Sequence, residues 1–230
     1  MERNFDYIVI GAGSAGCVMA NRLSENKKDT VLSIEAGGKD RNFFIHMPSG
    51  YSQLVPTRSN LNYGYETQPE PTTNNRKLYW PRGKVWGGSS SINAMVYIRG
   101  HAYDYDQWRQ LGNTGWSYDD VLPYFKKAEN FQGDGDDEFH GFGGPLNVKK
   151  SSRTDDLLLD VFLKAGEEAG FPLTDDFNGK EQEGFSRYEH TMKDTSFGPR
   201  RWSAARAYLH PALKLSLIHI SEPTRPRLIS

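Results

Sequence analysis

A run of two glycines and three serines, Gly87–Ser91, is the part of the chain best suited to binding chemistry. In such a turn the backbone N–H groups can converge on an anion. Arg82 and Lys84 place positive charge just upstream, which favours a phosphate. The stretch Ile92–Ile98 is apolar apart from Asn93 and suits one side of a flat ring system. From this segment alone, a plain glycine–serine loop between two elements remains the alternative.

A second glycine motif near the start of the chain supplies the partner that this turn needs. Gly11–Gly16 fits the pattern Gly-x-Gly-x-x-Gly. The β-branched and aromatic run at 5–10 before it predicts a buried strand, and 17–23 after it has helical spacing of its apolar residues. A second predicted strand at 30–34 is followed directly by Glu35. Strand, glycine turn, helix, strand and terminal acid are the parts of a dinucleotide-binding βαβ unit.

Each residue type in this motif has a physical reason. Gly11 allows the tight turn, Gly13 lets the backbone approach a pyrophosphate, and Gly16 lets the helix pack close to the strand. The positive end of the helix, where Ser14 stands, then stabilises the phosphates. Glu35 would accept hydrogen bonds from ribose hydroxyls and repel a 2′-phosphate, which argues against NADP.

Two other interpretations of the motif remain open at this point. Ser14 on a strand-to-helix turn is also the arrangement of a nucleophile elbow, although that elbow needs glycine where Ala12 stands. The turn could equally resemble a dinucleotide site and bind nothing.

The two segments together resemble the glucose-methanol-choline (GMC) family of flavin-dependent oxidoreductases, and within it the bacterial choline and aliphatic alcohol dehydrogenases. The resemblance covers about residues 5 to 214. It is carried by the following stretches: 11–16, 35–38, 62–71, 82–100, 101–106, 115–118, 121–129, 140–146 and 201–209.

The resemblance implies an α/β fold, with a Rossmann-like FAD-binding domain and part of an α+β substrate domain, truncated. We expect residues 1–150 to be the N-terminal part of the FAD-binding domain and 151–214 to begin the substrate-binding region. The covalent-flavin members of the family carry a histidine where this chain has Ile92, so the resemblance implies FAD held without a covalent bond.

The resemblance also assigns a function and a set of cofactor-binding residues. It implies oxidation of a CH–OH group, of choline or a primary alcohol to the aldehyde, with hydride passing to flavin N5. The family's catalytic base lies beyond residue 214, so no catalytic residue is predicted here, and an inactive fragment that at most binds a dinucleotide is the alternative. The implied cofactor-binding residues are Gly11, Gly13, Ser14, Gly16, Glu35, Ala36, Arg82, Val85, Gly87, Gly88, Asn93, Ala94, Met95 and Val96.

Composition narrows the partners and the compartment. In 230 residues, 28 Lys and Arg stand against 29 Asp and Glu, so the net charge of -1 gives no nucleic-acid footprint. The single cysteine, Cys17, excludes an internal disulfide and suits a reducing compartment. No stretch approaches a membrane span and no signal peptide fits before the first strand. We expect a cytoplasmic protein, with peripheral attachment to the inner membrane as the alternative, a small alcohol as substrate and an electron acceptor left open.

Histidines and aromatic residues give weaker signals. The six histidines have no metal-ligand spacing, so no metal site is predicted, and each is expected to be a surface or loop residue. Tyr63, Tyr65, Tyr79 and Trp80 could form a cage for a quaternary ammonium group, but packing in a partly buried loop is the commoner use of such residues.

Two segments near the end of the chain complete the predictions. Residues 154–170 are predicted to form an amphipathic helix, with Leu158, Val161 and Phe162 on one face. Residues 215–230 depart from the family, and 215–225 match the translation of a transposon-end adapter used in DNA sequencing libraries. We interpret this tail as an assembly artefact, with a natural disordered tail as the alternative.

Overall fold

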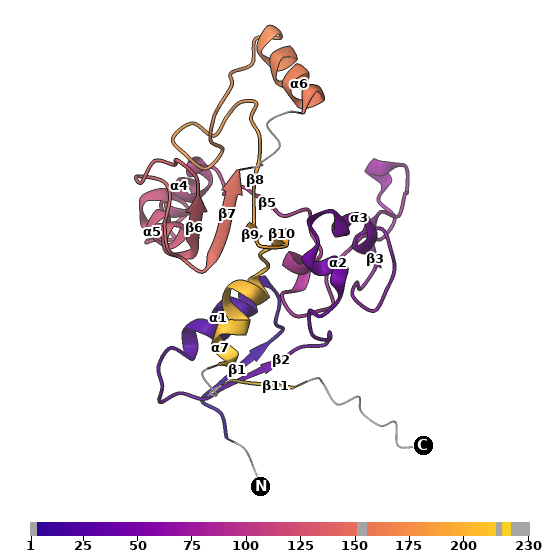
Figure 1. Ribbon diagram of the computed structural model, residues 1–230, viewed down its shortest axis with the longest axis vertical. Coiled ribbons are helices and arrows are strands. Elements are labelled where there is room, and N and C mark those ends of the chain that lie inside the picture. The colour runs from indigo at the N-terminus through magenta and orange to yellow at the C-terminus, as the bar shows by residue number, and fades with distance from the viewer. Residues whose placement is uncertain (1–3, 151–155, 215–217, 222–230) are drawn as a thin grey trace. The chain divides into compact units, whose positions relative to one another are not determined.

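The computed structural model describes residues 4–150, 156–214 and 218–221 (Figure 1). It divides into two compact units. The first is discontinuous and combines Met1–Ala94 with Asp194–Ser230, and the second is the continuous stretch Met95–Lys193. The boundaries expected at 150 and 214 follow a functional division into cofactor and substrate regions, which stays a prediction.

A small parallel sheet forms the base of the first unit. Its strand order is β1–β2–β11, with β1 at Tyr7–Ile10, β2 at Val31–Ile34 and β11 at Ile218–Ser221. In register, Tyr7 pairs with Val31 and Ile10 with Ile34. The two strands predicted in the βαβ unit are therefore confirmed, but the expectation that the first one is buried is wrong. Ile8 and Ile10 of β1 are 59% and 85% exposed, because β1 is at the edge of the described sheet. β11 falls in the segment that we interpret as an artefact, and the remainder of that segment lies outside the described residues.

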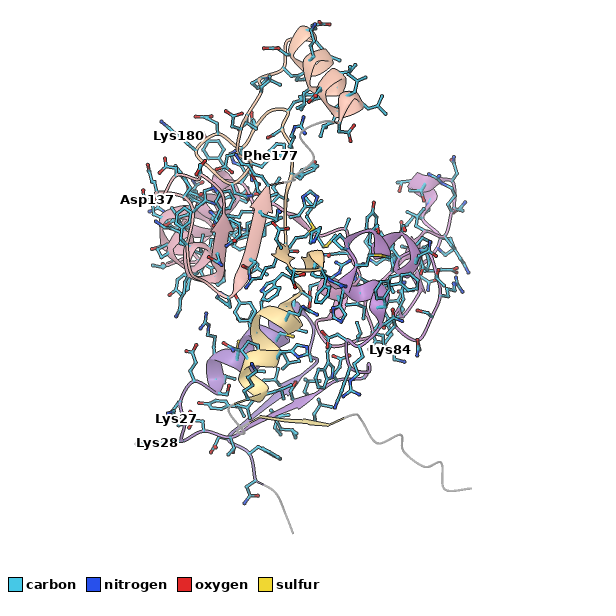
Figure 2. The ribbon with its side chains drawn as sticks, viewed as in Figure 1. Lys27, Lys28, Lys84, Asp137, Phe177 and Lys180 are labelled. Atoms are coloured by element: carbon cyan, nitrogen blue, oxygen red, sulfur yellow. The ribbon has the colours of Figure 1, made fainter. Side chains whose placement is uncertain are left out.

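Helices α1, at Ser14–Leu23, and α7, at His210–Leu213, lie beside each other against this sheet (Figure 1). α7 continues a π-helix at Ala205–Leu209, which packs on α1. The Nδ2 of Asn21 donates to the carbonyl of Tyr208 at 3.0 Å and joins the two helical segments. Lys27 and Lys28 lie in the turn between α1 and β2 (Figure 2).

The long excursion after β2 consists of short elements around a small apolar core. Buried Ile45, Leu54, Val85 and Ile92 form this core, and Leu61 packs against it. Its elements include α2 (Phe43–His46), α3 (Tyr51–Leu54) and the antiparallel pair β3 (Tyr65–Glu66) and β4 (Tyr79–Trp80). Much later in the chain, β9 (Met192–Thr195) and β10 (Gly198–Arg201) form a two-stranded sheet, and β10 contacts α2.

The second unit contains a four-stranded mixed sheet with the order β5–β8–β7–β6. β6 and β7 pair in parallel, whereas β8 runs antiparallel to both of its neighbours. The bounds are β5 (Val96–Tyr97), β6 (Glu129–Gln132), β7 (Leu146–Lys150), β8 (Glu189–His190), α4 (Ala102–Gln110), α5 (Tyr118–Ala128) and α6 (Leu157–Glu168). The predicted fold class, a parallel βαβ part joined to an α+β part, is confirmed.

α6 confirms the helix predicted at 154–170, within the described residues. Asp156 caps it by accepting a hydrogen bond from the N–H of Leu159, and Gly170 follows with a φ of 87°. Leu158 and Phe162 on its apolar face are 81% and 60% exposed, although the ring of Phe162 also contacts Phe185. The amphipathic pattern thus predicted the helix and left its apolar face largely uncovered in this chain.

Candidate dinucleotide-binding turns

The turn at the carboxyl end of β1 has the backbone that its glycines predict. Gly11 has a φ of 92°, which side chains larger than hydrogen disfavour, and its N–H donates to the carbonyl of Ile34 at 2.7 Å. A Cβ added to Gly16 would overlap the carbonyl oxygen of Gly11. These two glycines therefore act inside the fold, where one permits the turn and the other lets α1 approach the strand.

Gly13 differs from Gly16 because it borders open space, as Gly11 also does. A Cβ added there would meet nothing within 4 Å. Gly13 is also the N-cap of α1, and no side chain bonds to the first backbone N–H groups of the helix. Ser14 is exposed in that first turn. The free N–H groups and the positive helix end form a donor set for an anion.

The second glycine turn lies directly against the first. The N–H of Gly87 donates to the carbonyl of Ala12 at 2.7 Å, and a Cβ on Gly88 would come within 2.8 Å of the Cα of Gly13. Both Gly87 and Gly88 are buried, and residues 88–91 form one short 3-10 turn. Two motifs separated by more than 70 residues of sequence thus come together as one backbone surface.

Glu35 joins this surface from the end of β2. Its carboxylate is 6% exposed and accepts hydrogen bonds from the N–H of Ala12 at 2.7 Å and of Gly37 at 2.8 Å. Each oxygen carries two lone pairs, so two acceptor positions remain for ribose hydroxyls. Ala36 beside it is exposed. Sequence reasoning predicted a ribose contact for Glu35 and missed its bonds to Ala12 in the first glycine turn and to Gly37.

The basic residues upstream of the second turn lie on aromatic rings. Arg82 stacks over Trp80 with its guanidinium 5.3 Å from the ring centre, and its Nη1 donates to the carbonyl of Pro81. The ammonium of Lys84 lies 5.4 Å from the ring centre of Tyr63. A contact from Arg82 to phosphate stays a prediction. Val85, which follows, is fully buried in the apolar core.

These stacks also bear on the suggested quaternary-ammonium cage. Tyr63 and Tyr65 stack on each other with ring centres 5.0 Å apart, and Arg58 covers Tyr79. The chain's own cations therefore occupy ring faces that a ligand cation would need. The arrangement favours packing over a cage.

Asn93 and Ala94 close the first stretch of the first unit, and both are exposed. Asn93 is held from beneath by Arg201, whose Nη1 donates to the Asn93 carbonyl at 2.6 Å and to its Oδ1 at 2.8 Å. Sequence reasoning missed Arg201 as a site residue. Its position in a stretch that resembles the family, 201–209, was the available signal.

Met95 and Val96 begin the second unit. Met95 is buried and has a φ of 65°, and its carbonyl accepts a hydrogen bond from the N–H of Thr191 at 2.8 Å. Val96 starts β5 opposite His190 and is 41% exposed.

A buried charge network lies in the second unit. Glu129 Oε2 accepts from Arg99 Nη2 at 2.9 Å and lies 3.1 Å from His140 Nδ1, while His140 Nε2 lies 2.6 Å from Asp176 Oδ2. Burial alone would lower the pKa of His140, but the hydrogen bonds to Asp176 and Glu129 outweigh it and raise the pKa to about 9. His140 lies in a loop, as expected for each histidine, but it is not on the surface: it is 1% exposed, with two carboxylates bound to it. The expectation of a surface or loop position is wrong for His46 in α2 and His190 in β8, which are partly buried in regular elements.

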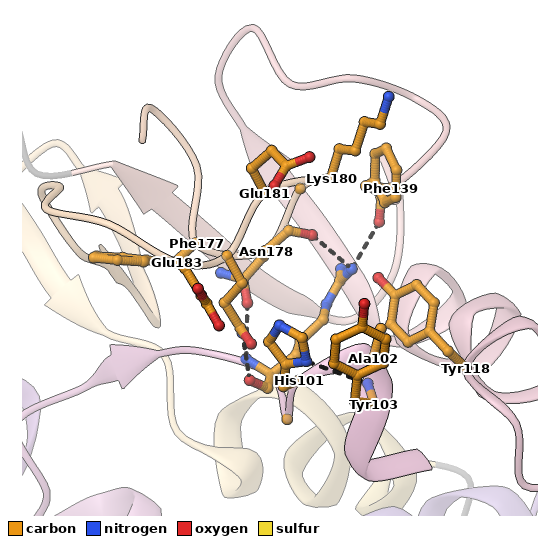
Figure 3. A pocket seen from close by; sticks show the side chains of 14 residues that line it. His101, Ala102, Tyr103, Tyr118, Phe139, Phe177, Asn178, Lys180, Glu181 and Glu183 are labelled. Carbon is orange, nitrogen blue, oxygen red and sulfur yellow. Dashed lines mark hydrogen bonds between the residues drawn. The ribbon is translucent and has the colours of Figure 1, made fainter. Parts of the chain in front are cut away.

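Beside this network a cavity of about 350 Å³ opens between the start of α4 and the loop 177–183 (Figure 3). Arg99 is among its lining residues and donates to the carbonyls of Phe139 and Asn178. The polar groups at its base are thus already bonded within the protein.

Other candidate chemistry is reported for the described residues only. Cys17 is buried, and burial raises the pKa of its thiol to about 12, which makes a redox role implausible on physical grounds. Among these residues no group of three or more His, Cys, Asp or Glu side chains is placed to hold a metal ion. No helix in the described parts of the chain is long and apolar enough to cross a membrane.

The residues at the glycine turns fit a dinucleotide such as FAD. Gly13 leaves the space that a phosphate needs, the first turn of α1 offers uncapped N–H donors, and Glu35 keeps free acceptor positions. The N–H donors beside Gly13 are therefore suited to phosphate, and the free acceptor positions of Glu35 are suited to ribose hydroxyls.

Relatives of known sequence match most of this chain. An oxygen-dependent choline dehydrogenase from Rhizobium etli (strain CIAT 652) is 52% identical over 209 residues, which is 91% of this chain and 37% of that protein. Another from Rhizobium johnstonii is 48% identical over 224 residues, or 97% of this chain and 40% of that protein. The chain thus spans about two fifths of the length of the curated relatives it matches.

Solved structures show the same fold. Pyridoxine 4-oxidase from "Mesorbium loti" aligns with a TM-score of 0.87 and 33% identity, covering 95% of this chain and 42% of that one. An FAD-dependent oxidoreductase from Chaetomium thermophilum aligns with a TM-score of 0.85 and 31% identity, covering 95% and 38%. The predicted cofactor, FAD, is confirmed by these relationships. A family model described as GMC oxidoreductase matches residues 5–225, and the chain belongs to that family.

Proposed function

We propose that this chain is the FAD-binding part of an oxidoreductase that oxidises the CH–OH group of a small alcohol such as choline. The observation that carries the proposal is the contact between the two glycine turns, with Gly13 open and the first turn of α1 uncapped. Relatives named oxygen-dependent choline dehydrogenases support the substrate class.

The chain's own residues would divide the work of holding the cofactor. The N–H groups at the start of α1, with Gly13 and Gly88, bind the pyrophosphate, and Glu35 accepts from the ribose. Asn93 and the apolar residues after it orient the ring system. Ile92 is buried and carries no nucleophilic atom, so FAD is held without a covalent bond at that position. When bound, FAD supplies the acceptor for the substrate's hydride.

The substrate proton needs a base within hydrogen-bond reach. By family resemblance that base lies beyond residue 214. We therefore propose that the 230-residue chain binds FAD and does not turn over alcohols. Hydride acceptance and proton removal are divided between this part and the part that follows in the relatives.

The experiment is an FAD titration of the chain, followed by quenching of flavin fluorescence. Gly13→Val should abolish binding without unfolding the chain, because the added methyl groups enter open space where the phosphate would lie. Met19→Val, at a half-exposed position of the same helix, is the matched control and should bind FAD as the unchanged chain does. Equal FAD binding by Gly13→Val and the control would overturn the assignment of the cofactor turn.

Catalysis is tested with a hybrid in which the Rhizobium etli relative's sequence continues after Lys214. The hybrid and the 230-residue chain are assayed with choline and a series of primary alcohols, with an artificial dye and with oxygen as acceptors. We expect turnover from the hybrid alone. Turnover by the chain at the hybrid's rate would show that the chain carries its own base, and an inactive hybrid that binds FAD would count against the substrate class.

A further inference from the structure

Arg201, the last residue of β10, is fully buried beneath the second glycine turn. Its Nε donates to the carbonyl of Ile45 at 2.7 Å. Its Nη1 donates to the carbonyl of Ser90 at 3.2 Å and to both oxygens of Asn93. One guanidinium thus connects α2 with Ser90 and Asn93 of the second glycine turn, whose serine-containing part, Ser89–Asn93, is called the serine turn below. A rigid planar donor group is suited to fixing several acceptors at once.

The chain from Arg201 onward reinforces this attachment. The N–H of Ala204 donates to Ser90 Oγ at 3.0 Å, and Ser90 Oγ donates to the carbonyl of Gly87 at 2.6 Å. A Cβ added to Gly87 would lie 3.1 Å from the Cβ of Ala205. Hydrogen bonds and packing from residues 201–205 therefore fix the conformation of the serine turn.

The charge of Arg201 has no counter-charge among the described residues. No described carboxylate forms an ion pair with it, and its Nη2 is buried without a hydrogen-bond partner. Burial lowers the pKa of Arg201 to about 10, so it stays protonated at neutral pH. Arg99, the other buried arginine, has Glu129 as its partner. A buried cation left without a partner is costly for the fold, which points to a ligand-directed role.

We propose that Arg201 is the positioning residue of the flavin site, which fixes the Ser90–Asn93 turn and favours bound reduced flavin over oxidised flavin through its unbalanced charge. This inference rests on the proposed function, since it takes the serine turn as the part next to the ring system. Reduced flavin carries more negative charge than oxidised flavin, and a fixed buried cation favours the electron-rich form.

The test compares Arg201→Met and Arg201→Lys with Arg206→Met in the 230-residue chain loaded with FAD. Arg206 stacks over Trp202 and makes no described bond to the serine turn, so its variant is the matched control. The readouts are the dissociation constant of oxidised FAD and the two-electron midpoint potential of the bound flavin. A loss of packing that weakens oxidised and reduced FAD equally leaves the potential unchanged, whereas loss of the charge weakens the reduced form more.

Arg201→Met should weaken oxidised FAD about tenfold and reduced FAD about a hundredfold. This tenfold difference corresponds to a midpoint potential about 30 mV lower. Arg201→Lys keeps the charge but loses the forked set of donors, so its affinity for FAD should fall. The ratio of its affinities for reduced and oxidised FAD should stay within twofold of that of the unchanged chain. Arg206→Met should change neither quantity.

Each outcome decides between the proposals. Failure of the unchanged chain to bind FAD would overturn the proposed function itself. FAD binding by the unchanged chain with affinity retained in Arg201→Lys would overturn the positioning role alone. An unshifted potential in Arg201→Met would overturn the charge effect. If Arg201→Met gives no folded protein, Arg201→Gln replaces it, and the same lowering of the midpoint potential is expected.

Discussion

The glycine turns of the first unit and the charge network of the second unit use polar groups in opposite ways. At the turns, Gly13 borders open space and the first N–H groups of α1 receive no side-chain cap. In the network, Arg99, Glu129, His140 and Asp176 are bonded to one another. The glycine turns leave backbone donors free for a ligand, whereas in the charge network the donors are bonded within the protein and stabilise the fold.

This difference separates a binding site from a structural cluster without reference to residue type. Charged and titratable residues are concentrated in the network, and a search by residue type would choose it as the active site. The glycine turns are almost without side chains and would be passed over. What identifies a site is the number of hydrogen-bonding groups left without protein partners, which is a property of the geometry.

The largest expected effect comes from removing the central acceptor of the network. Glu129→Ala leaves Arg99 and His140 buried without their shared carboxylate, and it should lower the free energy of unfolding by about 3–5 kcal/mol. Urea unfolding followed by circular dichroism measures the change. Glu168→Ala, which removes an exposed partner of Lys164, is the control and should change stability by at most about 0.5 kcal/mol. A loss below about 1 kcal/mol for Glu129→Ala would contradict the structural role.

The next effect is a loss of stability in alkaline solution. The pKa of His140 in the folded chain is raised from 6.5 to about 9, so its contribution is fully present below pH 6.5 and is lost as the pH rises through about 9. The facing groups are Glu129, Asp176 and, through Glu129, Arg99. We expect a loss of up to about 3 kcal/mol between pH 6.5 and 9. His140→Gln, compared by urea unfolding across this range, should remove most of the slope, and an unchanged slope would refute the assignment.

A smaller effect is expected at the open site. Glu35→Ala should weaken FAD binding by about 1–3 kcal/mol, the scale of a hydrogen bond to a charged group. Glu35→Gln retains one acceptor oxygen, so its FAD dissociation constant should lie between those of the unchanged chain and Glu35→Ala. The exposed Glu25, paired with Arg22, provides the control Glu25→Ala. FAD dissociation constants from fluorescence titration measure all three, and equal values for Glu35→Ala and the control would remove Glu35 from the site.

The smallest change in stability is expected on the outer strand. Ile8 in β1 is 59% exposed, and among the described strands β1 is at the edge of its sheet. Ile8→Lys should alter the free energy of unfolding by no more than about 0.5 kcal/mol and should raise the soluble fraction, because a charge on an edge opposes strand pairing between chains. Val9→Lys places the charge toward Gly16 and should destabilise the chain strongly. Light scattering and urea unfolding of both variants would show whether the edge causes association.

The βαβ unit was predictable because its rules act over short distances. Gly11, Gly13, Gly16 and Glu35 follow from a strand, a turn and a helix in sequence, each with a local pattern. The structure gives Gly11 and Gly16 the conformation and the packing that these rules require. The sequence indicated that the two glycine motifs serve one ligand, but the close approach of Gly88 to Gly13 is seen only in the structure.

Arg201 and His140 could not be predicted in the same way. Arg201 bonds to residues 108 to 156 positions earlier in the chain, and His140 bonds to Asp176 across 36 positions. No local periodicity encodes such pairs, and a lone histidine carries the same pattern whether it is exposed or buried. Only the folded chain shows which charges meet.

The discontinuity of the first unit has a consequence for the order of events at the ribosome. Residues 1–94 cannot complete their unit until 194–213 have been made, whereas the second unit is continuous and can close as it emerges. At synthesis rates of about 5–20 residues per second, the gap between residue 94 and Leu209 lasts roughly 6–23 s. During that time the helix face of α1 that later meets Tyr208 has nothing to pack on. The first unit is therefore expected to close only after the whole of the second unit has been synthesised.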